Sequence, residues 1–175
     1  MRTVIVYESM YGNTHAVATA IADGMRGGPD VTVVQVAEAT SDLVAAADLL
    51  VIGGPTHAHG MSSSYSRADA IETAGKDEDL HLDDAAYGPG LRGWFDELAD
   101  GGQRRCAAFD TRFDGPVVLT GRASRGIERR LHRHGYESLV APESFLVDKG
   151  NHLIDGELDR AMAWGSELAQ ALVET

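Results

Sequence analysis

Short hydrophobic segments alternate along the chain with longer segments in which hydrophobic residues recur every three or four positions. The short segments are rich in β-branched residues and are mostly bounded by residues that favour turns, as is typical of buried strands. The predicted strands are Thr3–Tyr7, Val31–Gln35, Leu49–Ile52, Arg105–Asp110 and Leu139–Val147. Strands that alternate with helices favour a parallel sheet covered on both faces, so the pattern predicts a doubly wound α/β fold with five parallel strands.

Helical periodicity fills most of the connections between these strands. Val17 and Ile21 are four residues apart after the first strand, and Ile127 and Leu131 have the same spacing before the fifth. The predicted helices are Thr14–Met25, Asp42–Ala47, Tyr65–Ala74, Leu91–Leu98, Ser124–His134 and Glu157–Val173. No linker-like change of composition divides the chain, so we expect one domain over residues 1–175.

The segment Met61–Asp100 is too long for a single crossover helix. Gly88-Pro89-Gly90 interrupts it, and five acidic residues lie between its two predicted helices. Two interpretations of this acidic stretch stay open: a solvated, mobile excursion of the chain, or a docking surface or lid beside a ligand.

Charge and composition narrow the classes of partner. The chain has 27 acidic and 15 basic residues, a formal net charge of −12, which repels nucleic acid and anionic membranes and favours basic protein surfaces. Acidity that serves solubility alone is the alternative. No hydrophobic run is long enough to span a bilayer and no secretory signal precedes the first strand, so we expect a cytoplasmic protein. Cys106 is the single cysteine and is predicted to be buried.

The first strand runs into a turn that contains hydroxyl, amide and glycine residues. Amide N–H groups at the start of the following helix would converge on one anion, and Ser9, Asn13 and Thr14 can add side-chain donors. Gly12 permits a positive φ and a close approach of the backbone. The turn has no Lys and no Gly-x-Gly-x-x-Gly, which argues against a Walker A loop and against a dinucleotide pyrophosphate. A monophosphate is therefore the predicted ligand group.

The motif Ser9-x-x-Gly12-Asn13-Thr14 after a Val/Ile strand resembles the phosphate loop of the flavodoxin family. The resemblance covers nearly the whole chain, as a short-chain type with an insertion after the third strand. It implies the strand order 2-1-3-4-5 and one non-covalently bound FMN. The FMN ligands that it implies in this turn are Ser9, Met10, Tyr11, Gly12, Asn13 and Thr14.

Two further loops should reach the same ligand, because ligands of doubly wound sheets bind beyond the carboxyl ends of the strands. Gly53-Gly54-Pro55-Thr56 resembles the family's Gly-x-Pro-Thr loop, which implies a course along the flavin ring and a peptide flip at Gly60 that tunes the redox potential. The loop after the fourth strand is expected at the pyrimidine edge. The implied ligands in these two loops are Pro55, Thr56, His57, Ala58, His59, Gly60, Asp110, Thr111, Arg112 and Phe113.

Other members of the family usually stack a Tyr or Trp on the flavin, and neither stands at the matching positions here. Phe113, His57 and His59 are the alternatives for this role. The pairs His57-x-His59 and His132-x-His134 lack the additional Cys or carboxylate ligands that a metal site needs, so no metal is expected.

Three functions stay open. The first is an electron-transfer flavoprotein that carries electrons from a reductase to an acceptor without a catalytic side chain; its redox partner proteins are expected to present basic faces. The second is an NAD(P)H-dependent quinone or FMN reductase of the same fold, in which His57, His59 or Arg112 could protonate or orient a quinone. The loop Gly54–Met61 also resembles that of tetrameric quinone reductases, which implies a possible homo-oligomer. The third is a flavin-free interaction module.

Overall fold

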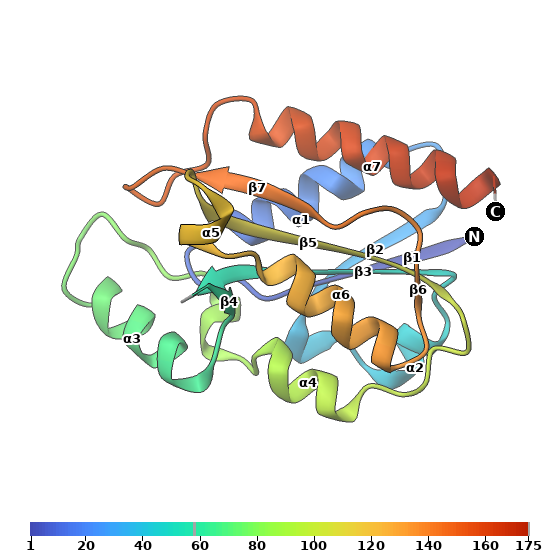
Figure 1. Cartoon of the computed structure of the whole chain (residues 1–175), viewed down its shortest axis with the longest axis horizontal. Coiled ribbons are helices and arrows are strands. Elements are labelled where there is room, and N and C mark those ends of the chain that lie inside the picture. The colour runs from blue at the N-terminus through green and yellow to red at the C-terminus, as the bar shows by residue number, and fades with distance from the viewer. Residues whose placement is uncertain (58, 175) are drawn as a thin grey trace.

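A mostly parallel sheet runs through the molecule between two layers of helices (Figure 1). The computed structural model describes residues 1–57 and 59–174. Its strands are β1 (Arg2–Tyr7), β2 (Asp30–Gln35), β3 (Leu49–His57), β4 (Gly60–Met61), β5 (Arg105–Phe113), β6 (Glu137–Ser138) and β7 (Glu143–Val147). The order is β2-β1-β3-β5-β6, with β7 also paired to β5 and β4 paired antiparallel to β3.

This order confirms the predicted 2-1-3-4-5 arrangement, with one difference in the fifth strand. The predicted continuous strand Leu139–Val147 is interrupted, so that β6 and β7 pair with different parts of β5. Pro142 lies in the interruption and has no N–H to donate to a ladder. Leu139 and Val140 still pack against the core beneath the sheet, which is why their hydrophobic character predicted a strand.

Helices cover the two faces of the sheet unequally. The helices are α1 (Asn13–Gly24), α2 (Ser41–Ala45), α3 (Ser64–Ala74), α4 (Leu91–Glu97), α5 (Val117–Thr120), α6 (Ala123–Arg133) and α7 (Glu157–Glu174), with 3-10 turns η1 (Val36–Glu38) and η2 (Asp84–Tyr87). In Figure 1, α1 and α7 lie on one face, α2, α4 and α6 lie on the other, and α3 lies beyond the carboxyl ends of the strands. The sequence did not predict α5.

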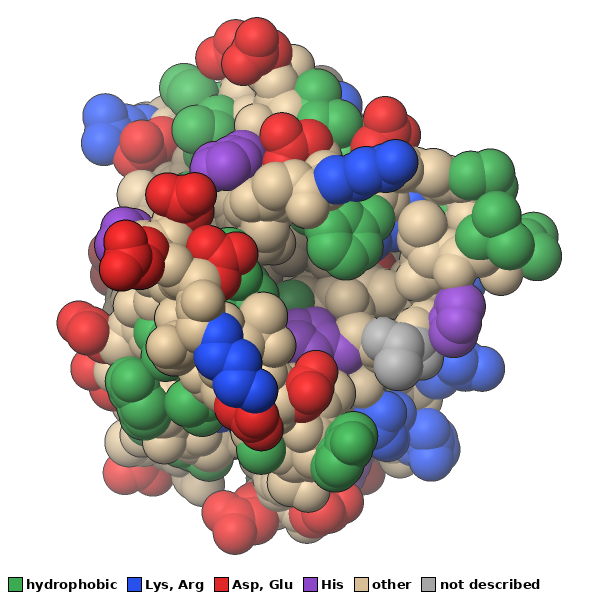
Figure 2. All heavy atoms as spheres, turned by 90° about the vertical axis from the view of Figure 1, so that its left-hand side faces the viewer, with side chains coloured by type: hydrophobic (Ala, Val, Ile, Leu, Met, Phe, Trp, Pro, Cys, Tyr) green, Lys and Arg blue, Asp and Glu red, His purple; other side chains and the backbone are tan. Residues whose placement is uncertain are grey.

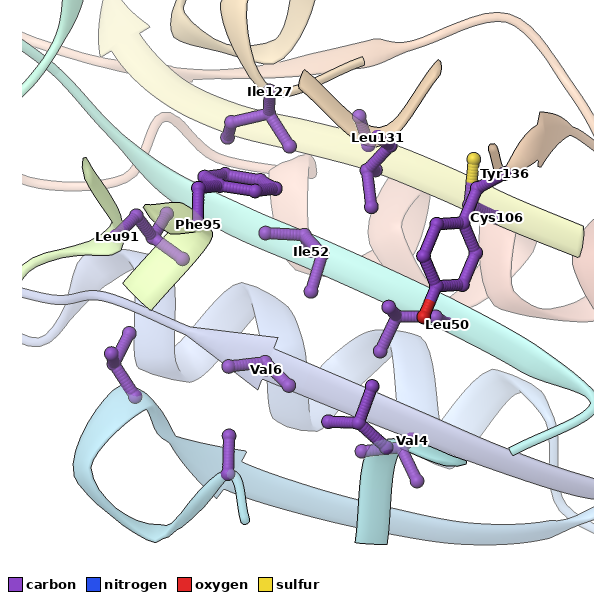
Figure 3. Close-up of a cluster of buried hydrophobic side chains, with 14 of the residues drawn as sticks. Val4, Val6, Leu50, Ile52, Leu91, Phe95, Cys106, Ile127, Leu131 and Tyr136 are labelled. Atoms are coloured by element: carbon purple, nitrogen blue, oxygen red, sulfur yellow. The ribbon is translucent and has the colours of Figure 1, made fainter. Parts of the chain in front are cut away.

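Alternation along the strands divides the core into two layers. Val4 and Val6 of β1 point to the α4 and α6 side, together with Leu50 and Ile52 of β3 (Figure 3). The intervening residues, such as Ile5, face α1 and α7. Because each strand is buried on both faces, its sequence is a continuous hydrophobic run rather than an alternating one, as predicted for parallel strands.

Trp164 and Cys106 both serve packing in the core. Trp164 is buried and meets the rings of Phe109 and Phe145 edge-on, with centroids 6.3 Å from each. Cys106 is 1% exposed, and burial raises the pKa of its thiol to about 12. The thiol is therefore protonated at neutral pH, when it is a poor nucleophile. Among the described residues, no helix has the length and hydrophobicity needed to cross a membrane.

Helices α1 and α7 pack closely because glycines stand where they touch. A Cβ atom at Gly165 would collide with the carbonyl oxygen of Ile21, and one at Gly24 would collide with that of Met162. The close approach of the two helices therefore depends on residues without side chains.

We expect Gly165→Ala to lower the free energy of unfolding by about 1–3 kcal/mol, because the added methyl group must push the helices apart. Gly93→Ala is the matched control: Gly93 also lies in a helix, is exposed, and has open space where its Cβ would lie. Helix propensity alone should make that change stabilising by about 0.5–1 kcal/mol. Urea denaturation measures both values. A Gly165→Ala protein as stable as Gly93→Ala would show that α1 and α7 can move apart at this contact without loss of stability.

Candidate functional site

A cavity of about 620 Å³ opens at the carboxyl ends of β1, β3 and β5 (Figure 2). The strands are in register there: Tyr7 pairs with Gly53, and Gly53 pairs with Phe109, so the segments that follow leave the sheet at one edge. The cavity is lined by Ser9, Met10, Tyr11, Asn13, Thr14, Pro55, Thr56, His57, His59, Ser63, Tyr65, Ser66, Asp69, Ala70, Thr73, Thr111, Arg112, Phe113, Leu119, Thr120, Val147 and Asn151. The structure therefore brings most of the predicted ligands together.

The turn after β1 has the backbone geometry that its sequence predicts. Gly12 adopts φ 88°, a left-handed conformation that L-residues adopt rarely, and it precedes the first residue of α1. The Oγ of Ser9 accepts a hydrogen bond from the N–H of Gly12 at 3.1 Å. The hydroxyl of Thr14 lies 2.8 Å from that of Thr111, which joins the turn to β5. Gly12 shapes the turn without lining the cavity itself.

Several amide groups of this turn have no partner. Among the described residues, no acceptor is present for the backbone N–H groups of Tyr11, Asn13 and Thr14, and the first helical bond is donated by Ala16 to the carbonyl of Gly12 at 2.9 Å. Such groups carry the positive end of the helix dipole, and buried or half-buried amides rarely stay unpaired. No Lys or Arg lies in the turn. The arrangement fits an anion held by backbone dipoles, such as a phosphate monoester.

Arg112 adds a donor on the opposite wall of the cavity. Its Nη1 donates to the carbonyl oxygens of Phe113 and Gly115 and to the hydroxyl of Thr120, at 2.9–3.1 Å. Its Nε–H is buried and has no acceptor within the described parts of the chain. A ligand with an acceptor atom at this wall would satisfy it, as a flavin carbonyl would.

The segment after Ile52 is a hairpin rather than the predicted glycine–proline loop. β3 continues through Pro55 to His57, and Gly60 pairs with His57 in the antiparallel strand β4. His59, not Gly60, has the left-handed backbone, at φ 73°, and it forms a bridge with Gly121. Gly60 does not line the cavity, and the predicted ligand Ala58 lies outside the described residues. Pro55 lies beyond the last pair of β1 with β3, Tyr7 with Gly53, where a missing N–H costs the sheet little.

The segment after the fourth predicted strand is also strand. β5 extends through Phe113, which is 50% exposed at the mouth of the cavity. Asp110 is fully buried and lies outside the cavity lining, so its assignment as a ligand is not supported by the structure. Its Oδ2 accepts the N–H of Ser124 at 2.7 Å and so holds the start of α6, and burial raises its pKa.

His57 is a predicted ligand whose pKa is altered by its surroundings. Its pKa is lowered from the ordinary value of 6.5, mainly by burial; the charge of Arg67 also lowers it, while that of Glu8 opposes the shift. The neutral ring therefore contributes to stability above pH 6.5, and this contribution is lost as the pH falls through the folded-state pKa.

We expect the imidazole of His57 to titrate below pH 6.5. Proton NMR of the histidine rings between pH 4 and 8 measures this, with the resonance assigned by its loss in His57→Gln. A midpoint at or above 6.5 would mean that the side chain is solvated, contrary to its place in the cavity.

Helix α3 forms a cavity wall that the sequence did not assign. Tyr65, Asp69 and Thr73 line the cavity from this helix, and the hydroxyl of Tyr11 donates to the carbonyl of Ala70 at 3.0 Å. A Ser63–Ser66 capping box starts the helix, a signal that can be read in the sequence. That α3 faces the ligand edge rather than the sheet is a tertiary feature without such a signal.

A buried ion pair fixes α3 to the first strand. Nη1 of Arg67 lies 2.7 Å from Oε1 of Glu8, and the Glu8 side chain also accepts from the hydroxyl of Ser62 and from the N–H of Leu91, the latter at 2.8 Å. Nη2 of Arg67 donates to the carbonyl oxygens of Ala86 and Gly88 at 3.0 and 2.6 Å. The insertion is therefore attached to the end of β1 at a point directly before the phosphate turn.

Comparison with known proteins agrees with this geometry. A family model described as flavodoxin matches residues 5–94, which is just over half of the chain and includes the turn, the hairpin and α3. The chain belongs to the flavodoxin family. Membership implies a flavin cofactor, typically FMN. None of the curated protein sequences matches the chain.

Solved structures share the fold over nearly the full length. An archaeal flavodoxin has a TM-score of 0.66 at 19% identity, with 99% of each chain covered. Flavodoxin 1 from Bacillus cereus has a TM-score of 0.65 at 17% identity, covering 97% of this chain and 98% of its own. A flavodoxin, WrbA-like protein from Agrobacterium tumefaciens has a TM-score of 0.61 at 20% identity, covering 99% and 98%. At these identities the likeness shows the fold alone.

Proposed function

We propose that this chain binds FMN in the 620 Å³ cavity and serves as an electron-transfer flavoprotein. The observation that supports this most is the set of unpaired backbone amides at Tyr11, Asn13 and Thr14. These amides could hold a phosphate group without help from a cationic side chain. The volume falls within the range of small-molecule sites. When bound, FMN would supply the redox chemistry, accepting and releasing electrons.

The residues of this chain would bind and orient the cofactor. The turn before α1 would hold the phosphate, with the hydroxyl of Thr14 available as a further donor. The hairpin at His57 and the wall at Arg112 would flank the ring system, and the unpaired Nε–H of Arg112 suits an acceptor there. The α3 wall would limit solvent access on the remaining side. No side chain needs to act as an acid or base in this function.

Titration of the flavin-free protein with FMN tests the proposal. We expect saturable binding at micromolar concentrations or below, with quenched flavin fluorescence, and much weaker binding of riboflavin. Stepwise photochemical reduction then separates one-electron from two-electron transfer by absorbance. An inability to bind FMN at micromolar concentrations would reject the proposal.

The extra room beside α3 and α5 favours a second candidate, an NAD(P)H-dependent quinone or FMN reductase. Tyr65, Asp69 and Leu119 line the cavity beyond the residues assigned to FMN, and His57 lies in the same space. Space of this kind could admit a second substrate. Steady-state oxidation of NADH or NADPH with benzoquinone distinguishes the two candidates: efficient turnover by the chain alone would favour the enzyme, and dependence on an added reductase would favour the carrier.

Three expectations from the sequence stay predictions. These are the cytoplasmic location, the possible homo-oligomer, and the basic-faced redox partner that the net charge favours. The flavin-free interaction module is the function that remains if FMN does not bind. The described residues contain no group of three or more His, Cys, Asp or Glu that could hold a metal.

A further inference from the structure

Arginines gather on one face of this acidic protein. Arg125, Arg129 and Arg133 follow one another at intervals of four residues on α6, so they lie on one side of the helix, and all three are exposed. Arg130 of α6 and Arg92 of α4 extend the group, since the charge of Arg92 acts on Arg130 together with those of Arg129 and Arg133. These five residues are called the arginine face below. Figure 2 shows basic side chains together at its lower right, while acidic ones dominate the opposite side.

The arginine face is not neutralised by the protein itself. Arg26, Arg67, Arg105 and Arg160 each pair with a carboxylate. Among the described residues, no salt bridge involves any member of the arginine face; Asp96 acts on Arg130 only at longer range, and Glu128 of α6 accepts instead from the hydroxyl of Ser138 at 3.0 Å.

Like charges four residues apart cost a helix about 0.2–0.5 kcal/mol per pair. The stripe Arg125, Arg129 and Arg133 contains two such pairs, with the Nε of each later arginine donating to the carbonyl of the previous one at 3.2 and 3.3 Å. The helix dipole offsets part of this repulsion, because Arg133 lies in the last turn of α6, and an anionic partner would relieve the rest.

The helix that carries most of the arginine face begins beside the mouth of the cavity. The N–H of Ala123, the first residue of α6, donates to the hydroxyl of Thr56, a cavity residue, at 3.0 Å. Directly before α6, α5 exposes Val118 at 90% and Leu119 at 69%, and Leu119 also lines the cavity. A hydrophobic centre beside a charged rim is the composition of a protein–protein interface.

We propose that the arginine face, together with α5, is the docking surface for a redox partner protein with an acidic face. This rests on the proposed electron-transfer function, because it places the partner over the cavity mouth. The stripe from Arg125 to Arg133 is about 12 Å long at 1.5 Å per residue, and the net charge is −12, so a compact acidic patch fits it better than an extended polyanion such as nucleic acid. The net charge alone predicts the opposite kind of partner.

A titration tests the proposal on the full chain as purified, with its flavin content recorded. The probe is an acidic plant-type [2Fe–2S] ferredoxin, added unlabelled to the ¹⁵N-labelled protein at low salt. We expect chemical-shift changes confined to residues 117–133 and their neighbours around the cavity mouth, and weaker binding at 0.5 M NaCl. Binding does not require flavin, so its failure is distinct from a failure to bind FMN.

Arg125→Glu/Arg129→Glu should raise the dissociation constant for the ferredoxin at least tenfold. The matched control is Arg2→Glu/Arg26→Glu, which changes the net charge equally at two exposed positions outside α4 and α6, the first residue of β1 and a residue just after α1. Absence of shifts, shifts on another face, or equal losses in both variants would overturn the proposal. Tighter binding of a 16-base-pair DNA duplex to the same residues would also overturn it, in favour of nucleic acid.

Discussion

Gly12→Ala is expected to weaken FMN binding by about 100-fold or more while the chain stays folded. Gly12 has φ 88°, and an Ala at such an angle costs about 1–2 kcal/mol, which the turn can relieve only by changing its backbone. That change would misdirect the N–H groups of Asn13 and Thr14, each of which could contribute about 1.5–3 kcal/mol to a phosphate. The loss of two such bonds corresponds to the expected factor.

Gly27→Ala is the matched control for this prediction. Gly27 has φ 86° and open space where its Cβ would lie, as Gly12 nearly has, but it follows α1 instead of lying in the turn that precedes this helix. Both changes should cost similar stability in urea denaturation, whereas only Gly12→Ala should affect the dissociation constant measured by flavin fluorescence. Riboflavin, which lacks the phosphate, should bind the natural protein and Gly12→Ala with similar weakness. Equal FMN affinity in the two variants would show that the phosphate lies elsewhere.

Arg67→Met is expected to destabilise the fold by about 3–5 kcal/mol, because it leaves the carboxylate of Glu8 buried without its counterion. Glu8 is 2% exposed, and its remaining partners are the hydroxyl of Ser62 and the N–H of Leu91. The change also removes the donors that Arg67 directs to the insertion. FMN binding should weaken as well, since the α3 wall loses its attachment to β1.

The double variant Glu8→Gln/Arg67→Met should recover part of that stability, because Gln keeps the acceptor for Leu91 and removes the buried charge. Arg105→Met serves as a control for the loss of an arginine: its pair with Glu137 is partly exposed and should be worth at most about 1 kcal/mol. Urea unfolding of the three proteins gives the comparison. A loss below 1 kcal/mol in Arg67→Met, or no recovery in the double variant, would mean that water reaches Glu8.

Most of the fold could be predicted because its signals are local. Buried parallel strands are continuous hydrophobic runs such as Val4–Val6, and the helices carry a repeat of three to four residues. The turn before α1 could be predicted equally well, because Gly12, which can adopt a positive φ, stands between Tyr11 and Asn13 directly before a helix. Boundaries were less well predicted: β3 and β5 continue several residues beyond Ile52 and Asp110, because pairing with neighbouring strands extends them.

The sequence by itself determined the order of strands and helices, the glycine-containing turn before α1 and the family resemblance, because each depends on residues that are neighbours in the chain. Only the tertiary structure decided that α3 lines the cavity, that Glu8 pairs with Arg67, and that the buried Asp110 holds the start of α6. It also decided that the arginines Arg125, Arg129, Arg130 and Arg133 of α6 stay without carboxylate partners among the residues described. These features depend on distances between segments far apart in the sequence, which no local periodicity encodes.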